Sequence, residues 1–394
     1  MKINLIQKSL VVAVSSTLLC SVALAKKLNN EIPVISPGDN QEILANTEKT
    51  ALHFTQQLTP DDQITLGDIG LSVSSKSYYQ EITGQQFKSG VSIITHGSEA
   101  IVRVTPAKST VLGKTSVAPS IEPADLELSG NAGQFNVNKS GMSVTARSDQ
   151  LNKAHPELFK NASAFTIDKQ MGAGKFALKT NKSVADDSRY LIHVFDKNSN
   201  VELNLGSQVS SYANGDKLSV SAGFNRNQKF DTGSVTATLI APDGRSFPMN
   251  VKNMKSGTNA EIDLSMNTNR RPGELWKVVF DASASGSTIK RTGELAIDIH
   301  EKTASVSSVD NAKGQMQVTL NVSKAGRYEV RSWQFTQNGK INEPDSIEYF
   351  ANWFEEGTHT ITLPVSTQKK GSIKPVQIQL LDQSRLAVLQ TITM

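Results

Sequence analysis

The sequence predicts an all-β protein built of several sandwich-like domains, and three observations lead to this prediction. Apolar residues come in short runs that alternate with polar residues, which is the pattern of antiparallel strands with one face in water. Gly, Pro, Asn and Asp separate these runs at intervals of about 8 to 12 residues through the second half of the chain, as in sandwich folds. The chain has 394 residues, more than one hydrophobic core usually serves, so we expect two or three domains.

The start of the chain has the three parts of a secretory signal peptide. Lys2 and Lys8 form a positive region, a short apolar centre follows, and Ala23 and Ala25 are the small residues of a cleavage site. We therefore expect cleavage before Lys26 and export to the periplasm or out of the cell. The apolar centre is shorter than the ~20 residues that a spanning helix needs, so no membrane span is expected.

The single cysteine and the modest charge exclude several classes of protein. Cys20 lies inside the expected leader, and Leu19 before it is too large for a lipoprotein acylation site, so the mature chain should have no disulfide and no cysteine ligand. The net charge of +4 falls to 4 − 2 = +2 once the two leader lysines are removed. The remaining basic residues are scattered, which argues against a nucleic-acid partner.

The first part of the mature chain is predicted to be an irregular β domain. A short helix is expected to begin at a Ser148 or Asp149 cap, and Pro156 near its middle should shorten or break it. The strand candidates are short apolar runs at residues 64–66, 91–94, 101–104, 126–128, 176–178 and 190–195.

The middle of the chain has the clearest strand pattern. Residues 235–240 and 247–251 both alternate apolar with polar side chains, and Pro242-Asp243-Gly244 lies between them. Proline and glycine favour a tight reversal at such a position, so we expect a hairpin. Further alternating runs follow at residues 260–266, 276–282 and 295–299.

The last part of the chain shows the same alternation of apolar and polar residues. Alternating runs occur at 316–322 and 361–365, and Asn338-Gly339 is a dipeptide typical of hairpin turns. We therefore expect a signal peptide over residues 1–25 and three domains, over residues 26–211, 212–300 and 301–394.

Several of these segments are similar to bacterial immunoglobulin-like modules. They are Thr232 to Leu239 before the Pro-Asp-Gly turn, Gly273 to Phe280, and Gly326 to Val330. The order of a leader, an irregular β domain and two such modules resembles domain-of-unknown-function family 4785, whose members are exported proteins of Gram-negative bacteria of about this length. The resemblance implies an N-terminal β-sandwich or jelly-roll-like domain followed by two immunoglobulin-like β-sandwich domains. It implies no functional residues.

The sequence has no catalytic signature. It lacks the H-E-x-x-H pattern of zinc proteases, the G-x-S-x-G nucleophile elbow and the glycine-rich loops that hold phosphate. A triad assembled from distant residues stays open, because triads are defined by geometry and not by spacing. No two of the six histidines have a spacing that metal sites favour; they are His53, His96, His155, His193, His300 and His359.

One segment has the oxygen spacing of a calcium loop. Asp196, Asn198 and Asn200 stand at alternate positions, but Val201 and Ser207 occupy the places where an EF-hand needs glycine and glutamate. Asn and Asp are also common in turns without metal, so a hairpin turn is the favoured interpretation. We expect no cofactor, with calcium as the alternative.

A cluster of four aromatic residues is the candidate partner-binding site. Tyr349, Phe350, Trp353 and Phe354 lie within six residues, and a strand would place two rings on each face. Aromatic rings dominate buried cores, which favours core packing. The alternative is an exposed patch that docks a protein or a sugar ring.

The function that these observations favour is a non-catalytic binding or interaction protein with a protein or glycan ligand. We also expect a monomer. The alternative is a secreted hydrolase, or an accessory subunit of one, with its site in the N-terminal domain. A fold of this kind does not decide between the two.

Overall fold

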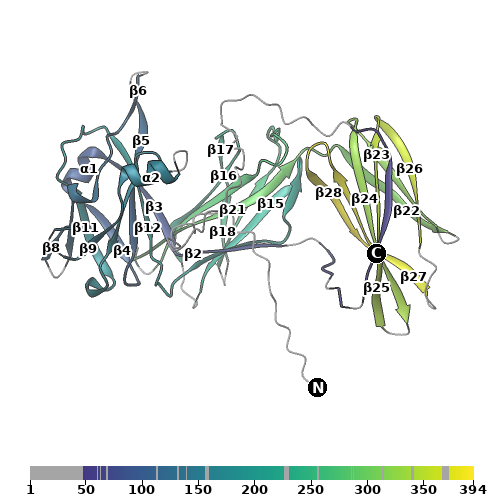
Figure 1. Ribbon diagram of the computed structural model, residues 1–394, viewed down its shortest axis with the longest axis horizontal. Helices are drawn as coiled ribbons and strands as arrows, with labels where there is room; N and C mark the ends of the chain where they lie inside the picture. Colours follow the sequence, from purple (N-terminus) through teal and green to yellow (C-terminus); the bar gives the residue numbers. More distant parts are fainter. Residues whose placement is uncertain are drawn as a thin grey trace, which may run out of the picture. The chain divides into compact units, whose positions relative to one another are not determined.

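The computed structural model describes residues 48–59, 61–62, 64–67, 70–111, 114–130, 133–138, 140–155, 159–225, 230–254, 257–284, 286, 288–312, 315–338, 341–365 and 372–394. The expected signal peptide with Cys20, Pro156 of the expected helix and Gly339 of the expected turn lie outside these residues. The described chain is almost entirely β, which confirms the predicted fold class (Figure 1). Within it, no helix is long and apolar enough to cross a membrane.

The N-terminal sandwich consists of two antiparallel sheets. One has the order β3 (Ser77–Thr83), β12 (Arg189–Phe195), β5 (Ile101–Val111), β10 (Ser163–Ile167) and β9 (Met142–Ala146), and β6 (Lys114–Val117) pairs with β5. The other has the order β4 (Val91–Thr95), β11 (Gly174–Thr180), β7 (Leu126–Gly130) and β8 (Gly133–Phe135). Alternate side chains of both sheets meet in one core that includes Val102, Phe165 and Tyr190.

Two short α-helices and two 3₁₀ turns connect these strands. Helix α1 (Gly84–Ser89) begins at a capping box, in which the Gln86 amide donates to Thr83 Oγ1 at 3.1 Å and the Thr83 amide donates to Gln86 Oε1 at 2.8 Å. Helix α2 (Ser148–Ala154) confirms the expected helix and buries Leu151, but its N-cap is Arg147 and not Ser148 or Asp149. The 3₁₀ turns are η1 (Pro123–Asp125) and η2 (Lys169–Met171).

The central sandwich also has two sheets. The first has the order β18 (Asn250–Met254), β19 (Gly257–Asp263), β15 (Lys217–Phe224), β13 (Leu203–Ser207) and β2 (Leu71–Ser75). The second has the order β14 (Ser211–Ala213), β21 (Ile289–His300), β20 (Trp276–Ala284), β16 (Phe230–Ile240) and β17 (Ser246–Pro248). Their shared core contains Leu239, Trp276 and Phe280, none of which is exposed to solvent.

The predicted Pro-Asp-Gly hairpin is present between β16 and β17. Gly244 has a φ of 88°, and its amide donates to the carbonyl of Ala241 at 2.9 Å, which closes the turn. After β17 the chain leaves this sheet, because β18 pairs with β19 of the opposite sheet. The second predicted strand is therefore divided between the two sheets of the sandwich.

The boundary expected at residue 211 lies inside the central sandwich. Strand β13 pairs with β15 and β2, and its Leu203 and Leu205 belong to the central core. The hairpin turn expected at residues 196–200 is instead a connection between two sandwiches, because β12 and β13 belong to different sheets. The partners of β13 lie 15 to 136 residues away, from the pair Gly206–Ser221 to the pair Ser207–Leu71, and a local pattern cannot reveal them.

The C-terminal sandwich is the third. A three-stranded sheet has the order β22 (Ala304–Ala312), β23 (Gln315–Val322) and β26 (Gly357–Pro364). A five-stranded sheet has the order β1 (Leu52–Gln57), β25 (Ile341–Phe354), β24 (Gly326–Asn338), β27 (Ser372–Asp382) and β28 (Ala387–Thr393). Tyr328, Val330 and Leu320 are fully buried between them.

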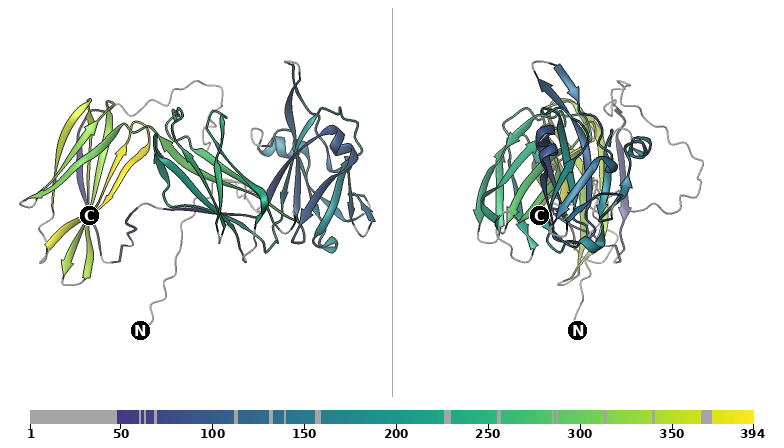
Figure 2. Two further views of the ribbon diagram at one scale, coloured as in Figure 1. Left: turned by 180° about the vertical axis from the view of Figure 1, so that it is seen from behind. Right: turned by 90° about the vertical axis from the view of Figure 1, so that its left-hand side faces the viewer.

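The first strand of the chain is thus an edge strand of the last sandwich. β1 runs antiparallel to β25, with Leu52 opposite Ala351 and Gln57 opposite Ser346. In Figures 1 and 2 this strand, in purple, lies beside the green strands of the C-terminal sandwich. β2 then joins the central sandwich and β3 the N-terminal one, so the first three strands contribute to three different sandwiches.

Candidate functional site

The aromatic cluster lies on β25 and is divided between the two faces of the sheet. Phe354 is buried in the C-terminal core, and Phe350 packs against that core. Tyr349 and Trp353 point to the outer face of the sheet, and both are half-buried. The four rings therefore have two different environments, and only the outer pair is placed to contact a partner.

The outer pair contacts the N-terminal segment of the same chain. The ring of Phe54 on β1 stacks on that of Tyr349, with centroids 4.5 Å apart and planes at 9°. The Tyr349 hydroxyl donates to Gln56 Oε1 at 3.0 Å. Lys49 Nζ lies 5.1 Å from the centre of the Trp353 ring, which is a cation–π distance.

The other face of β1 supplies hydrogen bonds to a buried carboxylate. Glu348 on β25 is only 2% exposed. Its Oε2 accepts a hydrogen bond from Thr55 Oγ1 at 2.8 Å and lies 3.2 Å from His53 Nε2. A buried carboxylate needs such partners, because loss of hydration is otherwise costly. Both of these partners come from β1.

Arg327 binds the backbone just before β1. This side chain is 4% exposed, and its Nη1 donates to the carbonyl of Glu48 at 2.9 Å and to that of Thr50 at 2.8 Å. At the other end of β1, the Leu58 amide donates to the carbonyl of Asp345 at 2.8 Å. We call the surface formed by the outer edge of β25 with Glu348, Tyr349, Trp353 and Arg327 the strand-docking edge.

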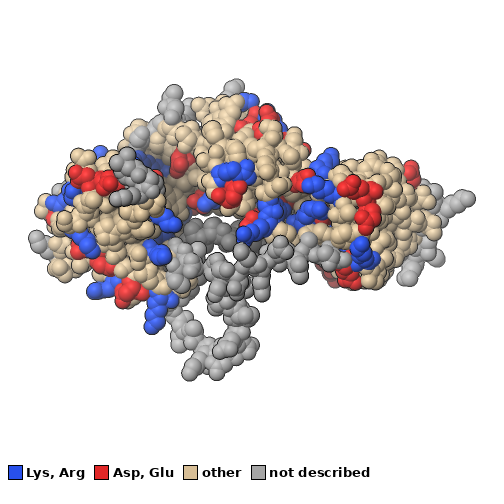
Figure 3. Space-filling view, turned by 90° about the horizontal axis from the view of Figure 1, so that it is seen from above, with Lys and Arg blue, Asp and Glu red and all other residues tan. Residues whose placement is uncertain are grey.

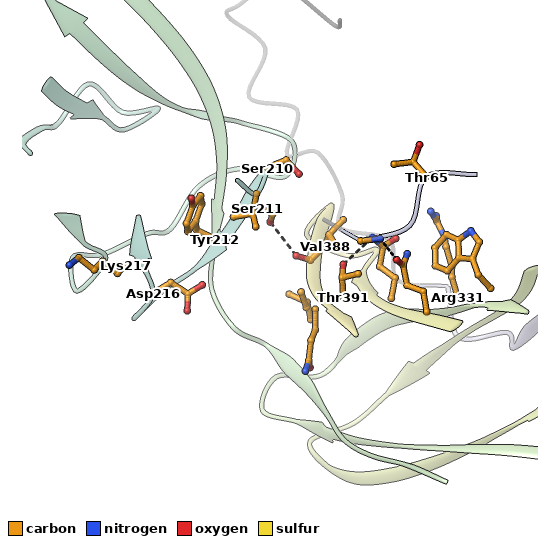
Figure 4. A pocket seen from close by; sticks show the side chains of 16 residues that line it. Thr65, Ser210, Ser211, Tyr212, Asp216, Lys217, Arg331, Val388 and Thr391 are labelled. Carbon is orange, nitrogen blue, oxygen red and sulfur yellow. Dashed lines mark hydrogen bonds between the residues drawn. The ribbon is translucent and has the colours of Figure 1, made fainter. Parts of the chain in front are cut away.

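A groove of about 650 Å³ lies over another part of the same outer face. Figure 4 shows Thr65, Arg331 and Thr391 on one side of it and Ser210, Ser211 and Tyr212 on the other. The remaining lining residues come from β24, β27, β28, residue 67 and the central sandwich: Gly67, Val209, Asp216, Lys217, Trp333, Gln377, Gln379, Val388, Leu389 and Gln390.

The groove is lined mainly by neutral polar groups. Gln377 is 2% exposed and accepts a hydrogen bond from the Gly67 amide through its Oε1. Gln379 Nε2 donates to Thr391 Oγ1 at 3.4 Å. Trp333 on β24 is half-buried and adds an aromatic face. Amide edges, hydroxyls and one indole therefore surround the cavity.

The charged lining residues are balanced by neighbours. Arg331 forms an ion pair with Glu329, and its guanidinium carbon lies 5.6 Å from the centre of the Tyr349 ring. Asp216 accepts a hydrogen bond from the Ala213 amide, and Lys217 pairs with Glu261 at 2.7 Å. On the face shown in Figure 3, basic and acidic side chains are interspersed over the described surface.

A serine, a histidine and an aspartate meet beside the groove. Ser211 Oγ lies 2.8 Å from Asp298 Oδ2 and 3.1 Å from His300 Nδ1, and His300 Nδ1 lies 3.1 Å from Asp298 Oδ2. In a catalytic triad the serine and the carboxylate contact opposite nitrogens of the imidazole. Here both contact Nδ1, and His300 Nε2 is buried with no hydrogen-bond partner in the described structure. These connections differ from those of a serine–histidine–aspartate catalytic triad.

Asp298 is held as an anion by the same network. Burial acts to raise the pKa of Asp298, but the hydrogen bond to His300 and the positive charge of Arg270 outweigh it, and the pKa is lowered overall. Ser211 Oγ also lies 3.2 Å from the carbonyl of Val388 (Figure 4). We therefore interpret the cluster as a structural contact between β14, β21 and β28.

The calcium candidate Asp196 belongs to a buried ion pair. This residue is fully buried; its Oδ1 accepts from the Gly97 amide at 2.9 Å, and its Oδ2 accepts from the His96 amide at 2.7 Å and from Arg291 Nη2 at 3.0 Å. Asn198 Nδ2 donates to the carbonyl of Ser98 at 3.1 Å. Protein donors thus occupy both oxygens of Asp196.

Asn200, the third calcium candidate, contributes its backbone carbonyl to Asn225 Nδ2 at 3.0 Å. Among the described residues, no group of three or more His, Cys, Asp or Glu side chains could hold a metal ion. Arg291, the partner of Asp196, is 95 positions away in the sequence and nothing nearby indicated the pairing. The alternate oxygens of 196–200 reflect a turn that this ion pair fixes.

His193 is the histidine with the most altered acidity. Its ring stacks on Tyr79 with centroids 4.5 Å apart, and the side chain is 5% exposed. Burial lowers the pKa of His193 to about 3, and the positive charge of Arg103 contributes. The group is therefore neutral at physiological pH, and it lies on the face of β12 opposite the core residues Tyr190, Ile192 and Val194, away from the groove.

Family models match the chain along most of its length. Domain of unknown function (DUF4785) N-terminal domain matches residues 44–196, the DUF4785 central domain matches 199–300 and the DUF4785 C-terminal domain matches 300–393. No curated protein matches the chain.

A solved structure is similar over almost the whole chain. The crystal structure of a DUF4785 family protein from Legionella pneumophila subsp. pneumophila str. Philadelphia 1 has a TM-score of 0.70 and 23% identity, and covers 89% of this chain and 94% of that one. Native alpha-2-macroglobulin of E. coli has a TM-score of 0.25 and 9% identity, over 80% of this chain and 19% of that one. The first likeness shows the fold, and the second carries no argument.

Proposed function

The chain belongs to the DUF4785 family, whose function is unknown, and we propose that it is a non-catalytic binding protein for a neutral oligosaccharide. The groove on the outer face of the C-terminal sandwich is the proposed site. Its combination of a half-buried indole with amide and hydroxyl groups is the observation that carries the proposal.

A sugar ring offers an apolar face of C–H groups and a rim of hydroxyls. The Trp333 indole suits the first, because an aromatic ring presents a broad apolar surface with a polar edge. The side chains of Gln379, Thr391 and Thr65 suit the second, since amides and hydroxyls both donate and accept hydrogen bonds. The volume of about 650 Å³ is within the range of small-molecule sites.

The hydrolase alternative receives less support from the same region. The Ser211, His300 and Asp298 cluster has the residue types of a triad but the wrong connections, as described above. Export is part of the proposal: the mature protein is expected to begin at Lys26, after removal of the leader. An exported protein with such a groove meets envelope or extracellular glycans.

The test is to titrate the mature protein with a panel of neutral oligosaccharides by calorimetry, and then to repeat the best one with Trp333→Ala. An aromatic anchor at the centre of a site contributes ~2 kcal/mol or more, so we expect an affinity loss of about 30-fold. Trp353→Ala is the matched control, because it removes the same side chain from the same face outside the groove lining. Unchanged affinity in Trp333→Ala, or no binding across the panel, would contradict the proposal.

A further inference from the structure

We propose that the strand-docking edge also binds β1 of a second copy of this chain, so that two molecules exchange their first strands and form a reciprocal dimer. This inference is separate from the groove and does not depend on its ligand. The interaction surface is the outer edge of β25, and the partner is an extended segment with the side chains of β1.

The docking edge has the contacts of a complete peptide-binding site. The β25 backbone pairs with all six residues of β1, which is how an extended peptide adds to a sheet edge. Side chains on both faces add specificity, because Glu348 selects the donors at positions 53 and 55, and Tyr349 selects the ring at position 54. The chain thus shows both a receptor and its ligand.

β1 is attached to this site alone. It is the outermost strand of its sheet, and all six of its residues are exposed. In the described part of the chain, no other strand pairs with it. Leu52 and Phe54 remain 51% and 47% exposed even while it is docked. A strand with so little burial is held mainly by its contacts with β25, and the residues just before it are held by Arg327 of β24.

The chain on the far side of β1 leads into a different sandwich. Strand β2 pairs with β13 of the central sandwich; between the two strands Thr59, Asp61, Asp62 and Thr65 are exposed, whereas Leu58 is buried and the Gly67 amide donates to Gln377 Oε1 of the C-terminal sandwich. If β1 moved to a second copy, that copy would supply the same β25 ladder, the same Glu348 and the same Tyr349. Exchange of an identical element is therefore a low-cost route to a dimer.

A second copy fits this edge better than an unrelated peptide. The β1 sequence Leu-His-Phe-Thr-Gln-Gln has no acidic or permanently basic residue, so it approaches the buried Glu348 without like-charge repulsion. It brings two hydrogen-bonding side chains to Glu348 and an aromatic ring to Tyr349 in the right alternation. A second copy of the chain has the same β1 sequence and therefore the same combination of side chains.

Two complementary single-cysteine variants test the exchange. Leu52 and Ala351 are directly opposed across β1 and β25, and opposed residues on paired strands have the separation that a disulfide needs. The chain from Lys26 has no cysteine of its own. Leu52→Cys and Ala351→Cys are made in separate chains, so neither chain can form a 52–351 disulfide within itself.

The two variants are refolded together over a range of concentrations and oxidised, and the products are mapped by non-reducing electrophoresis and peptide mass spectrometry. We expect a disulfide-linked heterodimer joined through positions 52 and 351, in a proportion that rises with concentration. The chain carrying both substitutions is the positive control, because it should form the same disulfide within one molecule.

Leu275→Cys mixed with Ala351→Cys is the matched control for random collision, since Leu275 is as exposed as Leu52, at 51%. No 52–351 link above this background, while the double variant closes its own disulfide, would overturn the proposal. A 52–52 link well above the 275–275 link of the control mixture, without a 52–351 link, would overturn it as well, because it would show that two docked β1 strands pair edge to edge.

Discussion

Two buried carboxylates join distant parts of this chain, and they differ in what holds them. Asp196 is fully buried and bonds to two backbone amides and to Arg291, a residue that is itself 1% exposed. Glu348 is 2% exposed, yet its partners His53 and Thr55 both lie on β1, a strand exposed along its whole length. The contact between Asp196 and Arg291 is buried between the N-terminal and central sandwiches. The contact of Glu348 depends instead on one strand, β1, which can separate from its sheet.

The Asp196–Arg291 joint should give the largest effect when it is broken. Arg291→Ala leaves a buried carboxylate without its counter-charge, and loss of one partner of a buried pair costs ~3–5 kcal/mol. We expect the free energy of unfolding from urea titration to fall by about that amount. Arg189→Ala is the control, because Arg189 pairs with Glu81 at 3.6 Å on the surface, and such pairs contribute ~0–1 kcal/mol. Equal effects of the two changes would refute the contrast.

The buried histidine His193 predicts that the stability of the fold depends on pH. The unfolded chain binds a proton at His193 below a pH of about 6.5, but the folded protein binds it only below about 3, since burial lowers the pKa of His193 to about 3. The unfolded state therefore binds more protons between these values, and stability falls as the pH is lowered through this window.

This loss should reach ~2–3 kcal/mol between pH 7 and pH 4.5, at ~1.4 kcal/mol for each pH unit below the unfolded pKa. His193→Gln should remove this part of the loss when unfolding is followed by circular dichroism at both pH values. His359→Gln, a half-buried histidine of the C-terminal sandwich, is the control and should retain it. Identical pH profiles for wild type and His193→Gln would contradict the assignment.

A substitution at the strand-docking edge should have the smallest effect on stability. Phe54→Ala removes the stacked ring from Tyr349, and an aromatic pair of this kind contributes ~1 kcal/mol. We expect amide exchange of residues 52–57 to accelerate about 5-fold, with no change in the strands of the central core. Leu275→Ala, at a similarly exposed apolar residue, should leave β1 unaffected. A general acceleration in Phe54→Ala would show that β1 is not separable.

Local patterns predicted many strands correctly, although the candidate at residues 64–66 is not a strand, and they predicted the partners of the strands poorly. The alternation at 235–240 with the Pro-Asp-Gly turn correctly predicted β16 and its reversal, because both depend on neighbouring residues. The same reasoning placed residue 211 at a boundary that lies within the central sandwich. Pairing between β2 and β13 spans more than a hundred residues, as the Ser74–Asn204 hydrogen bond shows, and alternation carries no information on it.

In the candidate site, too, the local features could be predicted from the sequence and the distant contacts could not. The cluster at Tyr349 and Trp353 was visible in the sequence because four aromatics fall within six residues. The identity of the segment that covers it was not, since Phe54 lies almost three hundred residues earlier, as does Thr55, which bonds to Glu348 across 293 positions. The groove residues Trp333, Gln379 and Thr391 come from three strands and form no sequence motif.

Hydrogen exchange of the intact protein in low concentrations of denaturant tests the contrast most directly. We predict that amides of residues 52–57 exchange by local release of β1, at a rate that low denaturant hardly changes. Amides of β12 and β21, beside Asp196 and Arg291, should exchange only through large-scale unfolding, with rates that rise steeply with denaturant. If β1 showed the same protection and the same denaturant dependence as β12 and β21, β1 would be a fixed part of the fold, and the account of a separable strand would be wrong.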